Sequence, residues 1–519
     1  MPRPTAARTP ALAWETMLDL GPGPAPLRDR LERAIREAVA SGRAPAGAAL
    51  PPSRALAETL GVSRWVVTEA YGQLVAEGFL EATVGSGTRV PARAATSPLV
   101  EPAAAIRARV VASDEGARVS RPDDEASTPA FVTTRPPAAA GATRRPSGLR
   151  GEYRRPRFDL GPGVPDLRHV PRTRWAAAVR RALEVLPDAE LTVVDRLGHP
   201  SARTAVAAYL ERSRHAVAAP DDVVITHSAT DGMTAVVASL KAAGHSAIVV
   251  EDPSWSKLRE VAAAAGLTPV PVPVDGDGID VEALERAARR TGARAALITP
   301  AHQFPMGAAL SPSRRDAIVR WARSVDGVLI EDDYDAEFRY DRRPIAALQG
   351  LAPDRVVLVG SLSKSMAQVF GLGWALMPPA LRERVRLAER PRPSTLEQAA
   401  LAQFIEGGDL ERHLRAARGR FRRRRAALLT ALGRELPELA VSGIAAGMHA
   451  VLALPAGVRA SDVSAAAARA ELAVADLTRY RASSAHSMPE ALVVGYGNLS
   501  DAVVDEAVAR LARVIRSFA

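Results

Sequence analysis

The chain has 519 residues and no cysteine, so we expect two or three domains and exclude disulfides, thiolate metal sites and cysteine nucleophiles. Apolar residues make up 47% and charged residues 24%. There is neither an apolar run of about 20 residues nor a secretory pattern at the start, so we expect a cytoplasmic protein without a membrane partner. The net charge of +10 favours an anionic partner such as nucleic acid.

The first predicted elements are three helices followed by a hairpin. Residues 27–40 carry apolar side chains at four-residue spacing, which predicts an amphipathic helix. Ser53 and Ser63 each precede a helical pattern and are expected to cap a helix. Residues 81–90 are typical of two short strands around a glycine-rich turn. This order predicts a winged helix-turn-helix domain over residues 20–92.

The start of the third helix is the part expected to enter the major groove of DNA. Backbone N–H groups at a helix start and arginine side chains both bind phosphate. The candidate DNA contacts are Ser53, Arg54, Ser63, Arg64, Thr68 and Arg89. From the spacing alone, a helical protein-interaction module without a DNA role is the alternative.

Residues 50–90 resemble the GntR-type regulator domain nearly throughout, in the motifs LP-x-SR-x-LA, LGVSR, AY-x-x-L-x-x-EG-x-L and GSGT. The resemblance implies that double-stranded DNA is the partner. Trp65 departs from the family, which usually has a small polar residue there, so base preference or local packing is expected to differ at this position.

A linker and a second, larger domain follow. Residues 93–155 are rich in alanine, proline and arginine and lack a hydrophobic period, which is typical of a linker. From residue 156 to 519, short β-branched runs alternate with helical stretches, which predicts a mainly parallel sheet covered by helices. The runs are residues 223–226, 247–250, 295–299, 327–330 and 356–360. A small α+β subdomain is expected from about residue 385 onward.

The strongest chemical signal is Lys364, which follows an apolar strand in the motif SLSKSM. The chain has only two other lysines, Lys241 and Lys257, because arginine supplies nearly all the remaining positive charge. Since arginine forms no stable imine, a lysine retained here indicates that the amine itself is needed. A Schiff-base lysine beside Ser361 and Ser363, whose hydroxyls can bind phosphate, fits this pattern. An ordinary surface lysine is the alternative.

Asp332 and Tyr334 stand at the end of another apolar strand. In an open α/β sheet such strand ends face the ligand crevice. A carboxylate there can pair with a protonated pyridine nitrogen, and a phenol can hydrogen-bond the ring hydroxyl. For the acidic stretch 331–333, a solvated charge run or a Mg²⁺ site is the alternative. We expect no metal site.

The motifs EDPSW, TPAHQFPMG, EDDYDAEFRY and SLSK occur in this order and together resemble the fold-type I aminotransferases. With the GntR-like segment, the chain resembles the MocR/GabR-type transcription regulators over residues 27–90 and 158–519. The resemblance implies a winged helix-turn-helix (α+β) fused to an α/β, fold-type I aminotransferase-like domain over residues 156–519. It further implies pyridoxal 5'-phosphate as cofactor and a homodimer.

The resemblance also implies a role for each matching residue. Lys364 would hold pyridoxal phosphate as an internal aldimine, Asp332 would pair with the pyridine nitrogen, and Tyr334 would contact the ring hydroxyl. Trp255 would stack on the ring, unless it is a plain core aromatic. The other candidate cofactor contacts are His302 and Gln303 beside the ring, and Ser228, Ala229, Thr230, Ser361 and Ser363 at the phosphate. Arg479 would bind the carboxylate of an amino-acid effector, unless it is a surface arginine.

Three departures from the family concern the phosphate. Gly371 stands where an arginine is expected, Asp231 adds negative charge to the phosphate-binding turn, and residues 193–203 replace the usual Y-G-D-P-x-G. A bidentate contact between arginine and phosphate is strong. Its loss is expected to weaken cofactor binding unless another arginine substitutes.

The sequence therefore predicts a DNA-binding transcription regulator that senses an amine or amino-acid effector through an aldimine on Lys364. An active aminotransferase with a DNA-binding appendage is one alternative, with Lys364 as the proton carrier. A degenerate, cofactor-free regulator is the other. The departures at the phosphate favour the regulator or the cofactor-free form, so we expect little or no transaminase turnover.

Overall fold

The computed structural model describes residues 14–18, 20–21, 26–83, 87–91, 156–191, 195–340, 345–483 and 488–518. The predicted linker, residues 93–155, lies outside these ranges, and so does the turn of the predicted hairpin, residues 84–86. Within these ranges, no helix is both long and apolar enough to cross a membrane.

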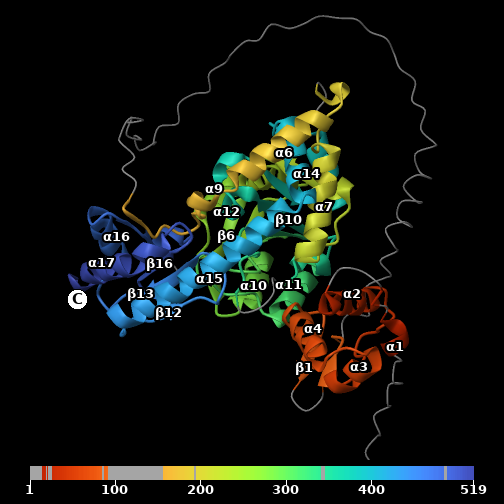
Figure 1. Ribbon diagram of the computed structural model, residues 1–519, viewed down its shortest axis with the longest axis horizontal. Helices are drawn as coiled ribbons and strands as arrows, with labels where there is room; N and C mark the ends of the chain where they lie inside the picture. Colours follow the sequence, from red (N-terminus) through yellow and green to blue (C-terminus); the bar gives the residue numbers. More distant parts are fainter. Residues whose placement is uncertain are drawn as a thin grey trace, which may run out of the picture.

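The N-terminal unit, red and orange in Figure 1, packs its helices around one core that includes Leu31, Ile35 and Leu74. Its elements are α1 (Trp14–Met17), α2 (Leu27–Ala40), α3 (Ser53–Leu60), α4 (Arg64–Ala76), β1 (Glu81–Thr83) and β2 (Gly87–Arg89). β1 and β2 pair antiparallel, as a hairpin requires. Ser63 caps α4, as predicted. The cap predicted at Ser53 is wrong, because Pro52 holds the cap position and Ser53 is the first residue of α3.

A central sheet of eight strands forms the larger part. Its order is β4 (Val223–Thr226), β11 (Gly373–Leu376), β10 (Val356–Ser361), β9 (Val328–Asp332), β8 (Ala295–Ile298), β5 (Ala247–Asp252), β6 (Thr268–Asp275) and β7 (Gly278–Ile279). β11 runs antiparallel to both neighbours and β7 runs antiparallel to β6, whereas the other neighbouring pairs are parallel. All five predicted runs lie in this sheet, which confirms the prediction of a mainly parallel one.

β6 was not predicted, because the sequence TPVPVPVD has three prolines. Proline cannot donate a backbone hydrogen bond, so it is tolerated at the edge of a sheet. β6 pairs along its length with β5 on one side, while β7 pairs only with its last two residues on the other. The proline nitrogens of β6, which carry no hydrogen to donate, therefore face the open side.

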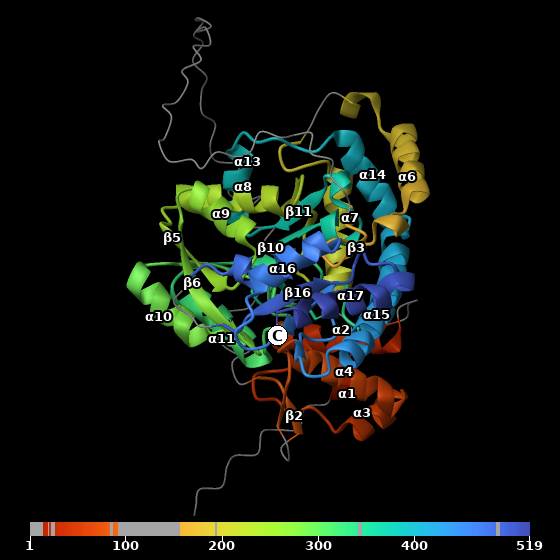
Figure 2. The same cartoon turned by 90° about the vertical axis from the view of Figure 1, so that its left-hand side faces the viewer.

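Helices cover both faces of the sheet because neighbouring residues on a strand point to opposite sides. On β9, Ile330 packs with the cluster that contains α8 (Ala229–Ala242), α9 (Ser256–Ala264) and α13 (Pro379–Leu387). Leu329 packs on the other side, with α10 (Val281–Thr291) and α11 (Pro312–Ser324). α6 (Arg172–Val185), α7 (Pro200–Arg214) and α14 (Thr395–Glu406) pack together beside them. In Figure 2, α8, α9 and α13 lie together at the upper left.

The smaller part contains a four-stranded sheet in the order β12 (Val441–Ser442), β13 (His449–Ala453), β16 (Ala491–Gly495) and β15 (Ala475–Asp476). α16 (Ala460–Arg469) and α17 (Val504–Arg516) accompany it, and β3 (Phe158–Asp159) pairs with β14 (Leu472–Ala473). The long α15 (Asp409–Glu435) runs between the two parts (Figure 1). The start of the small subdomain at about residue 385 stays a prediction. Because α14 packs against α6 and α7, we propose a later start, within α15.

Candidate functional site

The candidate site lies where the parallel strands β9 and β10 end. Asp332 is the last residue of β9 and pairs in register with Val359 of β10. Lys364 lies on α12 (Leu362–Ser365), the short helix directly after β10. The carboxyl ends of parallel strands share one edge of a sheet, which is where an α/β protein binds its ligand. The structure thus brings the predicted lysine and carboxylate to one edge.

The amine of Lys364 is held inside this site. Nζ donates a hydrogen bond to Gly163 O at 2.8 Å and lies 5.8 Å from the centre of the Trp255 ring. Burial lowers the pKa of Lys364, while the charges of Asp332 and Asp335 oppose this change. A lowered pKa increases the fraction of neutral amine, which is the nucleophilic form. Trp255 is 37% exposed and faces the amine, so it is no plain core aromatic.

Gly163 is a functional position that the sequence reasoning missed. Its φ angle is +73°, and a Cβ atom here would lie 2.8 Å from Lys364 Nζ. A side chain at this position would therefore displace the lysine. The signal that could have found it is the Gly161-Pro162-Gly163 turn, which follows a short strand.

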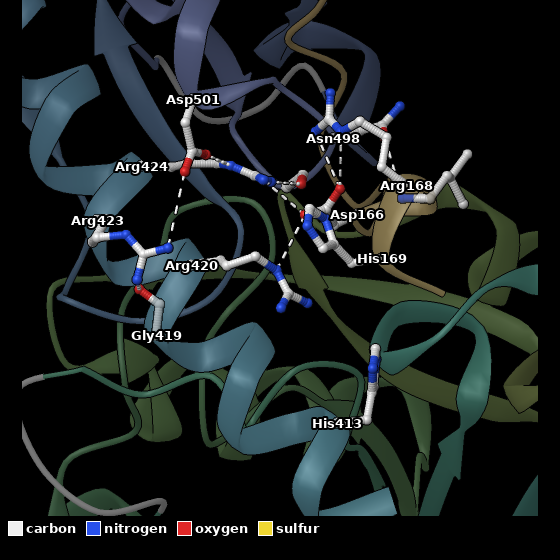
Figure 3. Close-up of polar contacts among 12 residues, drawn as sticks. Asp166, Arg168, His169, His413, Gly419, Arg420, Arg423, Arg424, Asn498 and Asp501 are labelled. Carbon is white, nitrogen blue, oxygen red and sulfur yellow. Dashed lines mark hydrogen bonds and ion pairs between the residues drawn. The ribbon is translucent and has the colours of Figure 1, made fainter. Parts of the chain in front are cut away.

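Two side chains of α15, Arg424 and His413, contact the segments around Lys364, and Figure 3 shows Arg424 beside Asp166. Arg424 donates to Asp166 Oδ2 at 2.7 Å and to Gly497 O at 2.6 Å, which fixes the turn that contains Gly163. Nearer the start of the same helix, His413 Nε2 donates to the backbone oxygen of Ser365 at 2.8 Å. Burial lowers the pKa of His413, so the ring is neutral while it donates. α15 therefore supports both the glycine turn and the lysine helix.

The carboxylate of Asp332 is buried, with 7% of the residue exposed. Burial raises its pKa to about 7, and the charge of Asp333 adds to the effect. Among the described residues, none donates a hydrogen bond to this carboxylate. It is therefore available to pair with a protonated ring nitrogen.

Because the pKa of Asp332 is raised, we expect the free energy of unfolding to depend on pH. Between its ordinary value of 3.8 and about 7, the folded state keeps a proton on Asp332 that the unfolded state releases. Stability of the cofactor-free protein is therefore lost as pH rises through this window. Asp332→Asn should remove this loss and raise the free energy of unfolding above about pH 7, by on the order of a few kcal/mol. Urea unfolding at about pH 5 and about pH 8 measures it.

Glu251 is a second buried carboxyl group that should contribute to the same pH dependence of stability. Burial raises its pKa to about 7 as well, so Glu251→Gln should remove a further part of the same pH dependence. Equal pH dependence in Asp332→Asn and the wild type would contradict the assignment of a protonated Asp332.

Tyr334 belongs to a buried group of polar side chains. His302 Nδ1 lies 3.0 Å from the Tyr334 hydroxyl and 3.0 Å from Asp335 Oδ2, while no described residue forms a hydrogen bond with the buried His302 Nε2. Burial raises the pKa of Tyr334 well above its ordinary value, so the phenol keeps its proton and can donate it to a ring hydroxyl. His302 and Asp335 thus orient the tyrosine.

Ligand atoms of His302, Asp335 and His449 lie within 4.8 Å of one another, a spacing that a metal ion could also use. The hydrogen bonds favour another role. His449 Nε2 donates to Pro305 O at 3.0 Å, and burial lowers the pKa of His449 to about 3. We interpret the group as a hydrogen-bonded support for Tyr334, and the absence of a metal site stays a prediction.

Gln303 supports the loop that carries His302. Its amide nitrogen donates to Glu251 Oε2 at 3.1 Å and to Pro253 O at 2.9 Å, and its amide oxygen accepts from Met306 N–H. These bonds use both ends of the amide. The predicted cofactor contact of Gln303 stays a prediction.

The candidate phosphate site is formed by the starts of α8 and α12. Ser228 caps α8, accepting from Asp231 N–H at 3.1 Å, and Ala229 and Thr230 are the first residues of the helix. Ser361 caps α12, accepting from Ser363 N–H at 3.3 Å. A Cβ atom on Gly373, between them, would lie 2.9 Å from the backbone of Ser228, so the two helix starts adjoin. Free N–H groups at a helix start bind phosphate.

Comparison with known proteins gives the family. Residues 156–511 match the family model for aminotransferase class I and II, and residues 27–90 match the bacterial regulatory proteins of the gntR family. The pyridoxine biosynthesis transcriptional regulator PdxR of Corynebacterium glutamicum is 30% identical over 433 residues, which are 83% of each chain. The probable rhizopine catabolism regulatory protein MocR of Rhizobium meliloti is 29% identical over 431 residues, 82% of this chain and 81% of that one.

The chain belongs to the MocR-type transcription regulators. Solved structures agree on the fold of the larger part. An archaeal alanine:glyoxylate aminotransferase superposes with a TM-score of 0.64 at 24% identity, over 69% of this chain and 91% of that one. A kynurenine aminotransferase of Pyrococcus horikoshii gives 0.63 at 21% identity, over 69% and 91%. The class I and II aminotransferase fold implies dependence on pyridoxal phosphate.

In this MocR-type regulator, five of the six predicted DNA contacts are exposed, namely Arg54, Ser63, Arg64, Thr68 and Arg89, and Ser53 is half-buried. Ser53 and Thr68 also line a cavity of about 750 Å³ between the winged unit and the larger part. Across the cavity are Asp277, Leu310, Ser311 and Pro312.

Arg479 lies at the margin of the site. It is exposed on a short 3-10 helix, Leu477–Tyr480, and its guanidinium lies 5.6 Å from the Tyr480 ring. Tyr480 packs edge-on against Phe304 at 4.9 Å, and Phe304 packs against Tyr334 at 5.9 Å. A row of three rings therefore connects Arg479 to the predicted cofactor contact, and its role with an effector carboxylate stays a prediction.

Proposed function

We propose that this protein is a pyridoxal phosphate-dependent transcription regulator of the cytoplasm that senses an amine or amino acid at Lys364 and alters its affinity for double-stranded DNA. The observation that carries the proposal is the buried amine of Lys364, which shares one edge of the sheet with Trp255 and the unpaired carboxylate of Asp332. In the regulators PdxR and MocR named above, both parts of the chain have counterparts.

The residues present fit the cofactor. Lys364 offers the amine, Asp332 the partner of the ring nitrogen, Tyr334 the donor to the ring hydroxyl, and Trp255 a face for stacking. The starts of α8 and α12 offer N–H groups and hydroxyls to the phosphate. When bound, the cofactor supplies an aldehyde that forms an imine with a primary amine, either that of Lys364 or that of an effector.

An effector changes DNA binding only if it favours one arrangement of the two parts over the other. One buried charge lies within electrostatic range of both parts. Arg315 of α11 is fully buried, and its charge interacts with Glu331, next to Asp332, and with Glu77, which follows α4 in the winged unit. Within the part of the chain that the structure describes, Nε and Nη1 of Arg315 have no hydrogen-bond partner. We infer that this guanidinium couples the cofactor edge to the position of the winged unit.

The test combines the visible absorbance of purified protein with DNA affinity. With pyridoxal phosphate bound, added amines and amino acids should change the absorbance and the affinity for the protein's own promoter region, without turnover. Steady consumption of an amino donor and a 2-oxo acid would instead favour the aminotransferase alternative, which the retained Lys364 and Asp332 keep open. Absence of any visible absorbance under saturating cofactor would favour the cofactor-free regulator.

DNA binding should depend on Arg64, the exposed first residue of α4. Arg64→Ala should cost about 1–3 kcal/mol of binding free energy if the guanidinium contacts a base edge. A gel-shift titration on the promoter region measures the loss. Arg384→Ala removes an equally exposed charge from α13, in the other part of the chain, and should leave the affinity unchanged. Equal affinities for the wild type and Arg64→Ala would refute this placement of the recognition helix.

We further propose a homodimer, because the sites of fold-type I aminotransferases are completed by a neighbouring subunit. Two winged units would then contact two half-sites on DNA. Sedimentation velocity at micromolar concentration should give the mass of two chains. A single chain at that concentration would argue against a shared site.

A further inference from the structure

The candidate phosphate site lacks the expected positive charge and carries an additional negative one. Position 371, where an arginine is expected, is a glycine with a φ angle of +57° and no side chain to offer. Asp231, in the first turn of α8, adds a carboxylate beside the same helix start, and its Oδ2 accepts from His227 N–H at 2.9 Å. A phosphate and a carboxylate repel each other. A site with both therefore needs a cation from elsewhere in the chain.

Arg390 lies beside Asp231 at the start of α8. It belongs to the segment between α13 and α14, far from the lysine motif in sequence, and its side chain is 9% exposed. Its Nη1 lies 3.8 Å from Asp231 Oδ2. Its Nη2 donates to Ile225 O at 2.9 Å, on the strand that leads into α8. The guanidinium is thus anchored beside the start of the helix that would hold the phosphate.

The hydrogen bonds of Arg390 are incomplete. Nε is buried without a partner among the described residues, and the contacts of Nη1 with Pro391 O and of Nη2 with Arg196 O are both 3.4 Å long. Only the bond to Ile225 O has an ordinary length. Burial lowers the pKa of Arg390, and Asp231 opposes this change. A buried guanidinium with unused donors is unfavourable unless an anion occupies them.

We propose that Arg390 supplies the positive charge for the phosphate of pyridoxal phosphate that position 371 does not supply, with Asp231 holding the guanidinium beside α8. Arg390 first offsets the charge of Asp231, which would otherwise repel the phosphate. Its remaining N–H groups then complement those at the starts of α8 and α12. This inference rests on the proposed function, because it assigns a residue to the same cofactor.

The test compares pyridoxal phosphate with pyridoxal, which has the same aldehyde and ring but no phosphate. Equilibrium dialysis and absorbance titration give the Kd of each ligand for the full-length protein. Arg390→Gln should raise the Kd for pyridoxal phosphate about tenfold or more and leave the Kd for pyridoxal unchanged. Arg390→Lys keeps the charge but not the fork of donors, so it should give an intermediate Kd. Arg384→Gln, an exposed arginine of α13, is the matched control and should behave as the wild type.

Two results would overturn the inference alone. One is an unchanged Kd for pyridoxal phosphate in Arg390→Gln. The other is an equal loss for both ligands, which would assign Arg390 to the support of β4 rather than to the phosphate. A wild type that binds neither ligand would overturn the proposed function as well, so the two failures are distinguishable.

Discussion

Lys364→Ala should abolish attachment of pyridoxal phosphate, the visible absorbance that depends on it, and the response of DNA binding to an effector. The reason is chemical, since Lys364 Nζ is the amine that lies at the edge with Asp332 and Trp255. The winged unit has its own core, so affinity for DNA without effector should stay largely intact. Lys364→Arg should not rescue the loss, because a guanidinium keeps the charge but forms no stable imine.

The other two lysines provide matched controls. Lys241 donates to Gly266 O at 3.0 Å on the surface, and Lys257 forms an exposed ion pair with Glu260. Lys241→Ala and Lys257→Ala should therefore retain the absorbance. Borohydride reduction followed by peptide mass mapping decides the matter. We expect a phosphopyridoxyl adduct on the peptide that contains Lys364. An adduct only on Lys241 or Lys257 would contradict the proposal.

Arg214→Met should produce the largest loss of stability in the aminotransferase-like part, about 3–5 kcal/mol. Arg214 ends α7, and its Nε donates to Asp333 Oδ2 at 2.7 Å, with 0% and 4% of the two side chains exposed. Removing the guanidinium leaves the Asp333 carboxylate buried beside Glu331 and Asp332 without its cation. Breaking one side of a buried pair costs more than the pair contributes, because the remaining charge has lost water as well.

Urea unfolding followed by tryptophan fluorescence measures this loss. The double variant Arg214→Met with Asp333→Leu removes both charges and should recover much of the stability, because no unpaired charge is then buried. Arg386→Met is the matched control, since Arg386 forms an exposed pair with Glu383 and should leave the transition unchanged. A double variant as unstable as the single one would show that packing, rather than charge, explains the loss.

Local features of the molecule were predictable because they depend on short-range physics. The helix Leu27–Ala40 matches its predicted range, since apolar spacing reports the face that a helix buries. Strands β4 and β10 follow from β-branched runs in the same way. The cap at Ser53 was wrong because Pro52 precedes it and already fits the cap position.

Part of the candidate site was predictable for a topological reason. Strand ends of a parallel sheet share one edge, so the sequence alone could assign Asp332 and Lys364 to one site. The sequence contains no sign that Gln303 donates to Glu251 and Pro253, because these residues are about 50 positions away in the chain. Nor does it show that Thr68 lines a cavity between the two parts.

By itself, the sequence determined the family, the order of the elements and the identity of the central lysine, because these depend on residue types and local spacing. Only the tertiary structure decided which distant groups meet. The bond from Lys364 to Gly163 spans 201 residues, and that from Arg214 to Asp333 spans 119. The contact of Arg390 with Asp231 likewise joins residues that are far apart in the sequence. Such contacts depend on how layers of helices and strands pack, and no local pattern in the chain records that packing.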